Sequence, residues 1–225
     1  ELSAEQMFGL RLKEADAAAK VLGVRSVACL DYPDGFLCDT PHTVLRGQFM
    51  EAIRAHRPNI VFTWDPWAPY EGHPDHRAVS WAAMEAASFA HFPLYYPEQL
   101  AGDVRPFYVP EVWYFAKNPT DVNKYVDISG SAIEKKIDAL CCYDSQMVLT
   151  LRDHQMAIES APYDVPRVTG LDPHDYRGYI DRTIRRGAER AGKRYGLEYA
   201  EQFRRTRWGG TERQAPEGTL PDDPV

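Results

Sequence analysis

Residues 59–79 read NIVFTWDPWAPYEGHPDHRAV. The first six residues form a short apolar run that is typical of a strand buried on both faces of a sheet. A loop rich in Trp, Pro and Tyr follows, and a helix is predicted from Pro74 to about His91. Proline suits the first turn of a helix because its missing N–H costs nothing there. The stretch therefore predicts a buried strand, a polar loop and a helix in succession.

The same alternation continues on both sides of this stretch. Helices are predicted over 3–22, 42–56, 131–143 and 175–195, and strands over 26–32, 111–116 and 124–129. Alternating strands and helices indicate an α/β fold in which helices cover an open, mostly parallel sheet. The helix over 3–22 has a capping box at Ser3 and Gln6 and a stop at Gly23. No strand precedes this crossover helix, so we expect the first strand to be missing from these residues.

The overall composition fits one folded domain. The 225 residues are 44% hydrophobic and 26% charged, and the net charge is −7. The negative charge argues against a nucleic-acid partner, and the basic run over 182–194 is interpreted as a solvated helix face. No apolar run is long enough to span a membrane. We expect a cytoplasmic protein with reduced, largely buried cysteines, a single domain over 1–208 and a disordered tail over 209–225.

Two polar loops should meet at one edge of the predicted sheet. Loops at the carboxyl ends of parallel strands carry the ligand site in such folds. Here they are DYPDG (31–35) and WDPWAPYEGHPDH (64–76). Their polar side chains are Asp31, Asp34, Asp65, His73, Asp75 and His76.

The spacing of the two histidines allows a metal site. Residues three apart lie on the same helix face, so His73 and His76 could reach one bound ion or substrate. Asp75 could accept an imidazole N–H and fix its tautomer. A neutral imidazole is a zinc ligand, and a second one can act as a general acid. The alternative is a pair of surface histidines at a helix start, with Asp75 as an ordinary first-turn acid.

The residues that would complete such a site are less clearly marked. Asp31, Asp34 and Asp65 are candidate ligands, and each could equally be a turn or cap residue. Trp67 and Tyr70 lie in a polar loop and are expected to contact substrate. Trp64 is as well explained by the core as by the pocket.

The sequence resembles the PIG-L or LmbE-like family of zinc-dependent N-deacetylases, which act on N-acetylglucosamine-containing compounds. The resemblance runs through LRLKEADAAAKVLGV (10–24), LDYPDG (30–35), RPNIVFTWDPWAPYEGHPDHRAV (57–79), VDISGSAIEKKIDAL (126–140) with SQ (145–146), and YAEQFR (199–204). It implies a Rossmann-like fold and hydrolysis of an acetamide by zinc-activated water.

The resemblance also implies roles for individual residues. His76 corresponds to a zinc ligand, and His73 corresponds to the acid or oxyanion-stabilising histidine with Asp75 as its orienting partner. Arg11 and Asp34 match the arginine and aspartate that hold sugar hydroxyls or neighbouring groups. Tyr70 lies where some members place a mobile tyrosine over the carbonyl oxygen.

Two departures from the family limit these expectations. The family's other zinc ligands and its general base sit in an Ala-His-Pro-Asp-Asp motif that these 225 residues lack. We therefore expect a truncated chain that binds zinc poorly and is inactive by itself. Tyr143 occupies a position where relatives commonly have His.

Other functions stay open at this point. A non-catalytic sugar-binding protein could keep the fold without the first motif, and an amidase acting on a thiol conjugate could keep the metal. An imidazole–carboxylate site could hold another divalent first-row ion instead of zinc. The sequence also leaves a homo-oligomer open.

Overall fold

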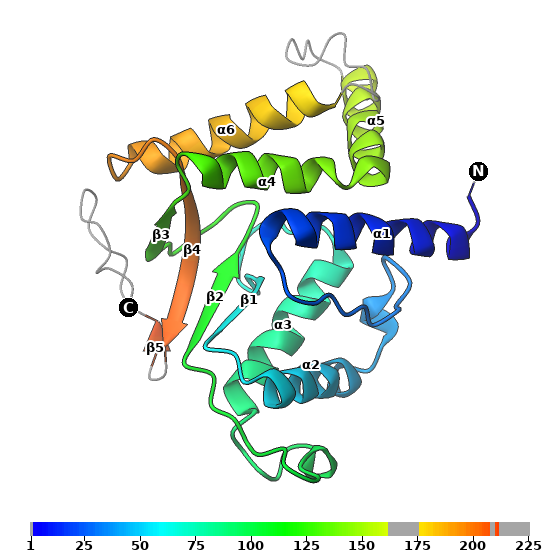
Figure 1. Ribbon diagram of the computed structural model, residues 1–225, viewed down its shortest axis with the longest axis vertical. Coiled ribbons are helices and arrows are strands. Elements are labelled where there is room, and N and C mark those ends of the chain that lie inside the picture. Colours follow the sequence, from blue (N-terminus) through cyan, green and yellow to red (C-terminus); the bar gives the residue numbers. More distant parts are fainter. Residues whose placement is uncertain (1, 162–175, 208–209, 212–225) are drawn as a thin grey trace. The chain divides into compact units, whose positions relative to one another are not determined.

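A computed structural model describes residues 2–161, 176–207 and 210–211 (Figure 1). Most of the expected tail over 209–225 and the start of the helix predicted at Asp175 lie outside these residues, but residues 210–211 form a short strand where disorder was predicted. None of the helices in the described part of the chain is long and apolar enough to cross a membrane. The chain forms two compact units, residues 1–30 with 127–201 and residues 31–126 with 202–225. The single-domain assignment over 1–208 stays a prediction.

The second unit contains most of the sheet. The strands are β1 (Ile60–Trp64), β2 (Glu111–Phe115), β3 (Lys124–Asp127), β4 (Ala200–Arg207) and β5 (Gly210–Thr211). Their order is β1-β2-β4-β3, and β5 pairs with β4. β1 runs parallel to β2, whereas β4 is antiparallel to both β2 and β5. The predicted α/β fold with one central sheet is confirmed, and the parallel part of this sheet is narrower than expected.

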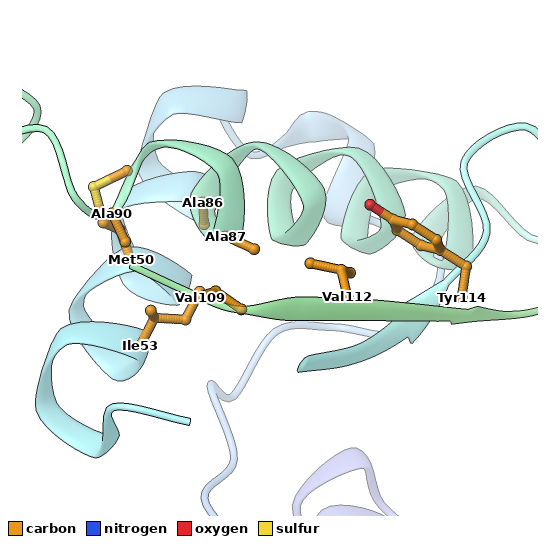
Figure 2. Close-up of a cluster of buried hydrophobic side chains, with 8 residues drawn as sticks. All are labelled: Met50, Ile53, Ala86, Ala87, Ala90, Val109, Val112 and Tyr114. Carbon is orange, nitrogen blue, oxygen red and sulfur yellow. The ribbon is translucent and has the colours of Figure 1, made fainter. Parts of the chain in front are cut away.

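Two helices pack on one face of this sheet. They are α2 (His42–His56) and α3 (Pro74–Phe89), and the short 3-10 helices η1 (Leu37–Asp39) and η2 (Pro97–Gln99) lie in the connections. Figure 2 shows the core that they form with β2 and the residues before it. Its members are Met50, Ile53, Ala86, Ala87, Ala90, Val109, Val112 and Tyr114. Two alanines of α3, Ala86 and Ala87, and its C-cap residue Ala90 have small side chains that allow the end of this helix to approach β2 closely.

Two strand predictions need correction. Residues 26–32 form no strand, and the apolar side chains of Val24, Val27 and Leu30 are exposed. A β-rich sequence becomes a strand only where it finds a partner, and the sheet of the described residues provides none for it. β1 itself is not buried on both faces, because Phe62 is 53% exposed.

The first unit is mainly helical. It contains α1 (Ala4–Leu22), α4 (Ser131–Cys141), α5 (Asp144–Ser160) and α6 (Arg177–Lys193). The predicted capping box of α1 is present at Ser3, and Gly23 ends the helix in the left-handed conformation. α4 begins after Gly130, its N-cap residue, and no side chain caps this helix.

The four cysteines are free, as expected, but they are not buried. Cys29 and Cys38 are exposed, and Cys141 and Cys142 are half-buried. The exposure of Cys29 follows from the missing strand at 26–32, whose inward side chains have no core to enter.

Candidate functional site

The start of α3 positions the first histidine. His73 is the N-cap residue, and its Nδ1 accepts a hydrogen bond from the backbone N–H of Asp75 at 3.2 Å. A nitrogen that accepts carries no proton, so the proton of neutral His73 lies on Nε2. This Nε2 lies 3.5 Å from Oδ1 of Asp34, whose side chain is 92% exposed. His73 therefore presents an N–H donor towards solvent at the sheet edge.

Asp75 connects α3 to the loop that carries Asp34. Its Oδ2 accepts the backbone N–H of Gly35 at 2.6 Å, and its Oδ1 accepts that of Leu37 at 3.0 Å. The carboxylate was expected to accept an imidazole N–H. It holds the 34–37 loop instead, and the contact with His73 is made by the backbone N–H of Asp75.

His76 is held in a stack of rings. Its ring centroid lies 3.8 Å from that of Trp64 at an interplanar angle of 13°, and 4.4 Å from that of His73 at 20°. Burial lowers the pKa of His76, against the opposing effect of the nearby Glu71 carboxylate. A neutral imidazole keeps one lone pair, which a metal ion requires. Trp64 therefore belongs to the site, because its ring fixes the plane of His76.

The structure adds Glu71 and Lys117, which the sequence did not single out. Oε1 of Glu71 lies 3.1 Å from Nδ1 of His76 and 3.1 Å from Nζ of Lys117. The ring N–H is not aligned on this oxygen, so the contact with His76 is an electrostatic pairing outside hydrogen-bond geometry. Burial opposes ionisation of Glu71, but the His73 N–H, Lys117 and His76 outweigh it and lower its pKa. A carboxylate two residues before His73 was the available signal.

The donor set at this edge fits a divalent ion. Potential ligand atoms of Asp34, His73 and Asp75 lie within 4.8 Å of one another, but both nitrogens of His73 are engaged in the tautomer described above, so the two carboxylates are the free donors of this cluster. Mixed imidazole and carboxylate donors suit zinc and other first-row divalent ions. Both Asp75 oxygens already accept backbone amides, so each has one lone pair left for a metal.

The other two candidate aspartates have different surroundings. Asp65 accepts the backbone N–H of Trp67 at 2.9 Å and pairs with Arg204, whose Nε lies 3.1 Å from Oδ2. Burial raises the pKa of Asp65, with the Trp67 N–H and Arg204 acting against it. Asp31 is exposed and has a left-handed backbone. Asp65 thus anchors the loop after β1, and neither residue belongs to the cluster of Asp34, His73 and Asp75.

The two aromatic side chains of the loop, Trp67 and Tyr70, differ in their exposure and contacts. Trp67 is 46% exposed, contacts Trp81 and Tyr114 edge-on, and lies under the Arg204 guanidinium at 5.2 Å from the ring centroid. Tyr70 is 91% exposed and has φ 62°, a conformation that few non-glycine residues adopt. A fixed indole and an extended phenol thus stand in the loop that leads to the histidines.

The remaining predicted residues lie in the first unit. Arg11 is on α1, with its NH1 3.7 Å from Oε2 of Glu14. Glu14 is buried and accepts both the backbone N–H and the hydroxyl of Ser145 at 2.7 Å. Tyr143 precedes α5, and burial raises its pKa. The roles of Arg11 and Tyr143 stay predictions.

Comparison with known proteins supports the resemblance stated from the sequence. Residues 1–87 match the family model PIG-L, described as GlcNAc-PI de-N-acetylase. The matched residues contain both polar loops and His73, Asp75 and His76.

This part of the chain is similar to the PIG-L family.

Curated relatives of this chain are deacetylases by name. It is 36% identical over 148 residues to diacetylchitobiose deacetylase of Thermococcus kodakarensis, which covers 65% of the chain and 53% of that relative. It is 28% identical over 189 residues to 1D-myo-inositol 2-acetamido-2-deoxy-alpha-D-glucopyranoside deacetylase of Mycobacteroides abscessus, which covers 70% of the chain and 66% of that relative. The chain thus spans from about half to two thirds of the length of these relatives.

A solved structure has the same fold. N,N'-diacetylchitobiose deacetylase from Pyrococcus horikoshii superimposes with a TM-score of 0.70 at 25% identity. The match covers 92% of this chain and 67% of the other. The expected α/β fold and the resemblance stated from the sequence are both confirmed.

Proposed function

We propose that this chain carries part of the active site of a metal-dependent hydrolase that removes the N-acetyl group from an N-acetylglucosamine-type glycoside. The observation that carries the proposal is the stack of Trp64, His76 and His73 beside Asp34 and Asp75. The names of the relatives support the substrate class, because they refer to acetylated amino sugars.

Each histidine has a separate task in this proposal. His76 is a metal ligand, because burial keeps its imidazole neutral. His73 is the general acid or oxyanion donor, because Asp75 occupies its Nδ1 and leaves the proton on Nε2. A general acid of this kind contributes about 10²–10⁴-fold to turnover.

Zinc is the proposed metal, and His76 would hold it together with carboxylate or imidazole donors from the same edge. A bound zinc ion polarises a carbonyl and lowers the pKa of bound water to about 7. Asp34 is exposed, its Oδ1 lies 3.5 Å from Nε2 of His73, and its carboxylate can accept sugar hydroxyls. Trp67 and Tyr70 offer aromatic faces on which a sugar can stack.

Acetate release from diacetylchitobiose tests the proposal. The assay compares the chain alone with the chain joined to a segment that carries the Ala-His-Pro-Asp-Asp motif, because we expect the chain alone to bind zinc weakly. Zinc-dependent acetate release by the joined protein supports a deacetylase. Sugar binding without acetate release would support a non-catalytic binding protein, and cleavage of only a thiol conjugate would support an amidase.

A further inference from the structure

Glu71 is a buried carboxylate in direct contact with the proposed metal ligand. Its side chain is only 8% exposed, although it lies in the loop before α3. Three nitrogen atoms lie close to Oε1. They are the backbone N of His73 at 3.0 Å, Nζ of Lys117 at 3.1 Å and Nδ1 of His76 at 3.1 Å. A carboxylate with this burial and these contacts has a fixed position.

The loop around Glu71 is itself anchored to α3. NH1 of Arg77 donates to the backbone oxygens of Glu71 at 2.9 Å and Gly72 at 3.2 Å. Lys117 follows β2 and also lies 5.9 Å from the centre of the Trp64 ring. Glu71 is thus tied to the first turns of α3 and to the end of β2, so it moves with the elements that carry His76 and Trp64.

An ionised carboxylate determines which imidazole nitrogen keeps its proton. Carboxylate oxygens only accept, so a lone pair on Nδ1 at 3.1 Å would repel Oε1, whereas a proton there is attracted. The proton of neutral His76 therefore belongs on Nδ1, and the lone pair on Nε2. Stacking on Trp64 and His73 fixes the plane of the ring but does not distinguish its two nitrogens.

We propose that Glu71 is a positioning residue that holds the His76 proton on Nδ1 and so directs Nε2 to the metal. This inference rests on the proposed role of His76 as a metal ligand. A carboxylate behind a metal-bound histidine fixes its tautomer and raises its basicity, and the loss of such a partner typically weakens metal binding about 10- to 100-fold. Nζ of Lys117 pairs with the same oxygen of Glu71 at 3.1 Å and so helps to hold the carboxylate in place.

The first test reads the tautomer directly in the metal-free chain. The ¹⁵N shifts of the His76 ring, assigned with a His76→Asn variant, are recorded at about pH 8, above the usual imidazole pKa of about 6.5. We expect the proton on Nδ1. A proton on Nε2 in the unaltered chain would overturn the inference, and this reading requires no variant of Glu71 to fold.

The second test replaces Glu71 by a residue of the same shape. In Glu71→Gln, we expect the Nε2-protonated tautomer to gain population and zinc to bind at least tenfold more weakly. The matched control is Glu85→Gln, because Glu85 also pairs with an imidazole, at 2.9 Å from Nε2 of His42, in the same unit. The control should leave the His76 tautomer and zinc affinity unchanged. An unchanged tautomer in Glu71→Gln would refute the inference.

The inference and the proposed function fail in different ways. If Glu71→Gln moves the proton but His76→Ala binds zinc as tightly as the unaltered chain, His76 is not a ligand and the proposed function loses its metal site. If His76→Ala loses zinc but Glu71→Gln leaves the His76 tautomer unchanged, the proposed function stands and the positioning role of Glu71 is refuted.

Discussion

The Asp75 carboxylate joins the start of α3 to the 34–37 loop, because its two oxygens accept the N–H groups of Gly35 and Leu37. A negative charge in the first turn also interacts favourably with the helix dipole. One buried side chain therefore holds together the two segments that carry Asp34 and His73.

Asp75→Asn should loosen this connection. The amide keeps one acceptor oxygen but turns an N–H₂ group towards a backbone donor, so one of the two bonds is lost. We expect a loss of about 1–3 kcal/mol in the free energy of unfolding, measured in urea. Asp39→Asn is a matched control on η1 in the same loop region. Equal stability of both variants would show that the Asp75 bonds contribute little.

Alanine at each histidine should separate binding from chemistry. His73→Ala removes the proposed donor, so turnover should fall about 10²–10⁴-fold while zinc content is kept. His76→Ala removes a ligand, so most of the bound zinc should be lost. Acetate release and metal analysis of the motif-bearing protein measure both effects. Equal zinc retention in the two variants would contradict this division of roles.

The sequence predicted part of this site well. Two histidines at a three-residue spacing and a proline in the first helical turn were enough to bring His73 and His76 together. The direction of the Asp75 carboxylate was not predictable, because its acceptor bonds depend on a loop about 40 residues away. Glu71 and Lys117 meet only when β2 lies beside β1, so no local spacing could reveal their contact.

At the level of elements, periodic helices were predictable and context-dependent strands were not. α1 and α2 begin and end within one or two residues of the prediction, and α1 has the predicted capping box at Ser3. β4 was missed because its sequence AEQFRRTR is polar, although Arg204 and Arg205 are buried in the sheet. Such a strand is stabilised by pairing with β2 rather than by its own hydrophobic pattern.

Two glycines of α6 should respond in opposite ways to alanine. A Cβ at Gly192 would lie 2.5 Å from the backbone oxygen of Leu197, whereas Gly187 has open space around it. Gly192→Ala should destabilise the protein by about 1–3 kcal/mol through overpacking. Gly187→Ala should stabilise it by about 0.5–1 kcal/mol, because alanine favours a helix.

Chemical or thermal unfolding of both variants checks this prediction. They change the same residue type in the same helix, so they differ mainly in the contact with Leu197. If both variants were stabilised, α6 would have to end differently from the arrangement described above.

For the molecule as a whole, the comparisons support the fold more strongly than they support a particular reaction. The chain shares its α/β architecture with the Pyrococcus horikoshii enzyme, yet it spans about half of one curated relative. Compartment, oligomeric state and metal identity stay predictions, because a shared fold does not determine them.

The four thiols should report on the state of the whole molecule. We expect a thiol reagent to modify the exposed Cys29 and Cys38 quickly and Cys141 and Cys142 slowly. Burial also raises the pKa of Cys141, which reduces its reactive thiolate. Cys29→Ser should remove one fast equivalent. Four equally fast thiols would mean that α4 opens readily in solution.

The bare apolar stretch over 24–30 has a practical consequence for handling the isolated chain. The exposed apolar side chains of Val24, Val27 and Leu30, in a β-rich stretch that forms no strand, offer a surface to the same stretch of a neighbouring molecule. Concentrated solutions should therefore become turbid before the fold is lost. In Val27→Lys, the added charge should oppose association of this stretch. Light scattering at high concentration should therefore fall while the circular dichroism spectrum stays the same.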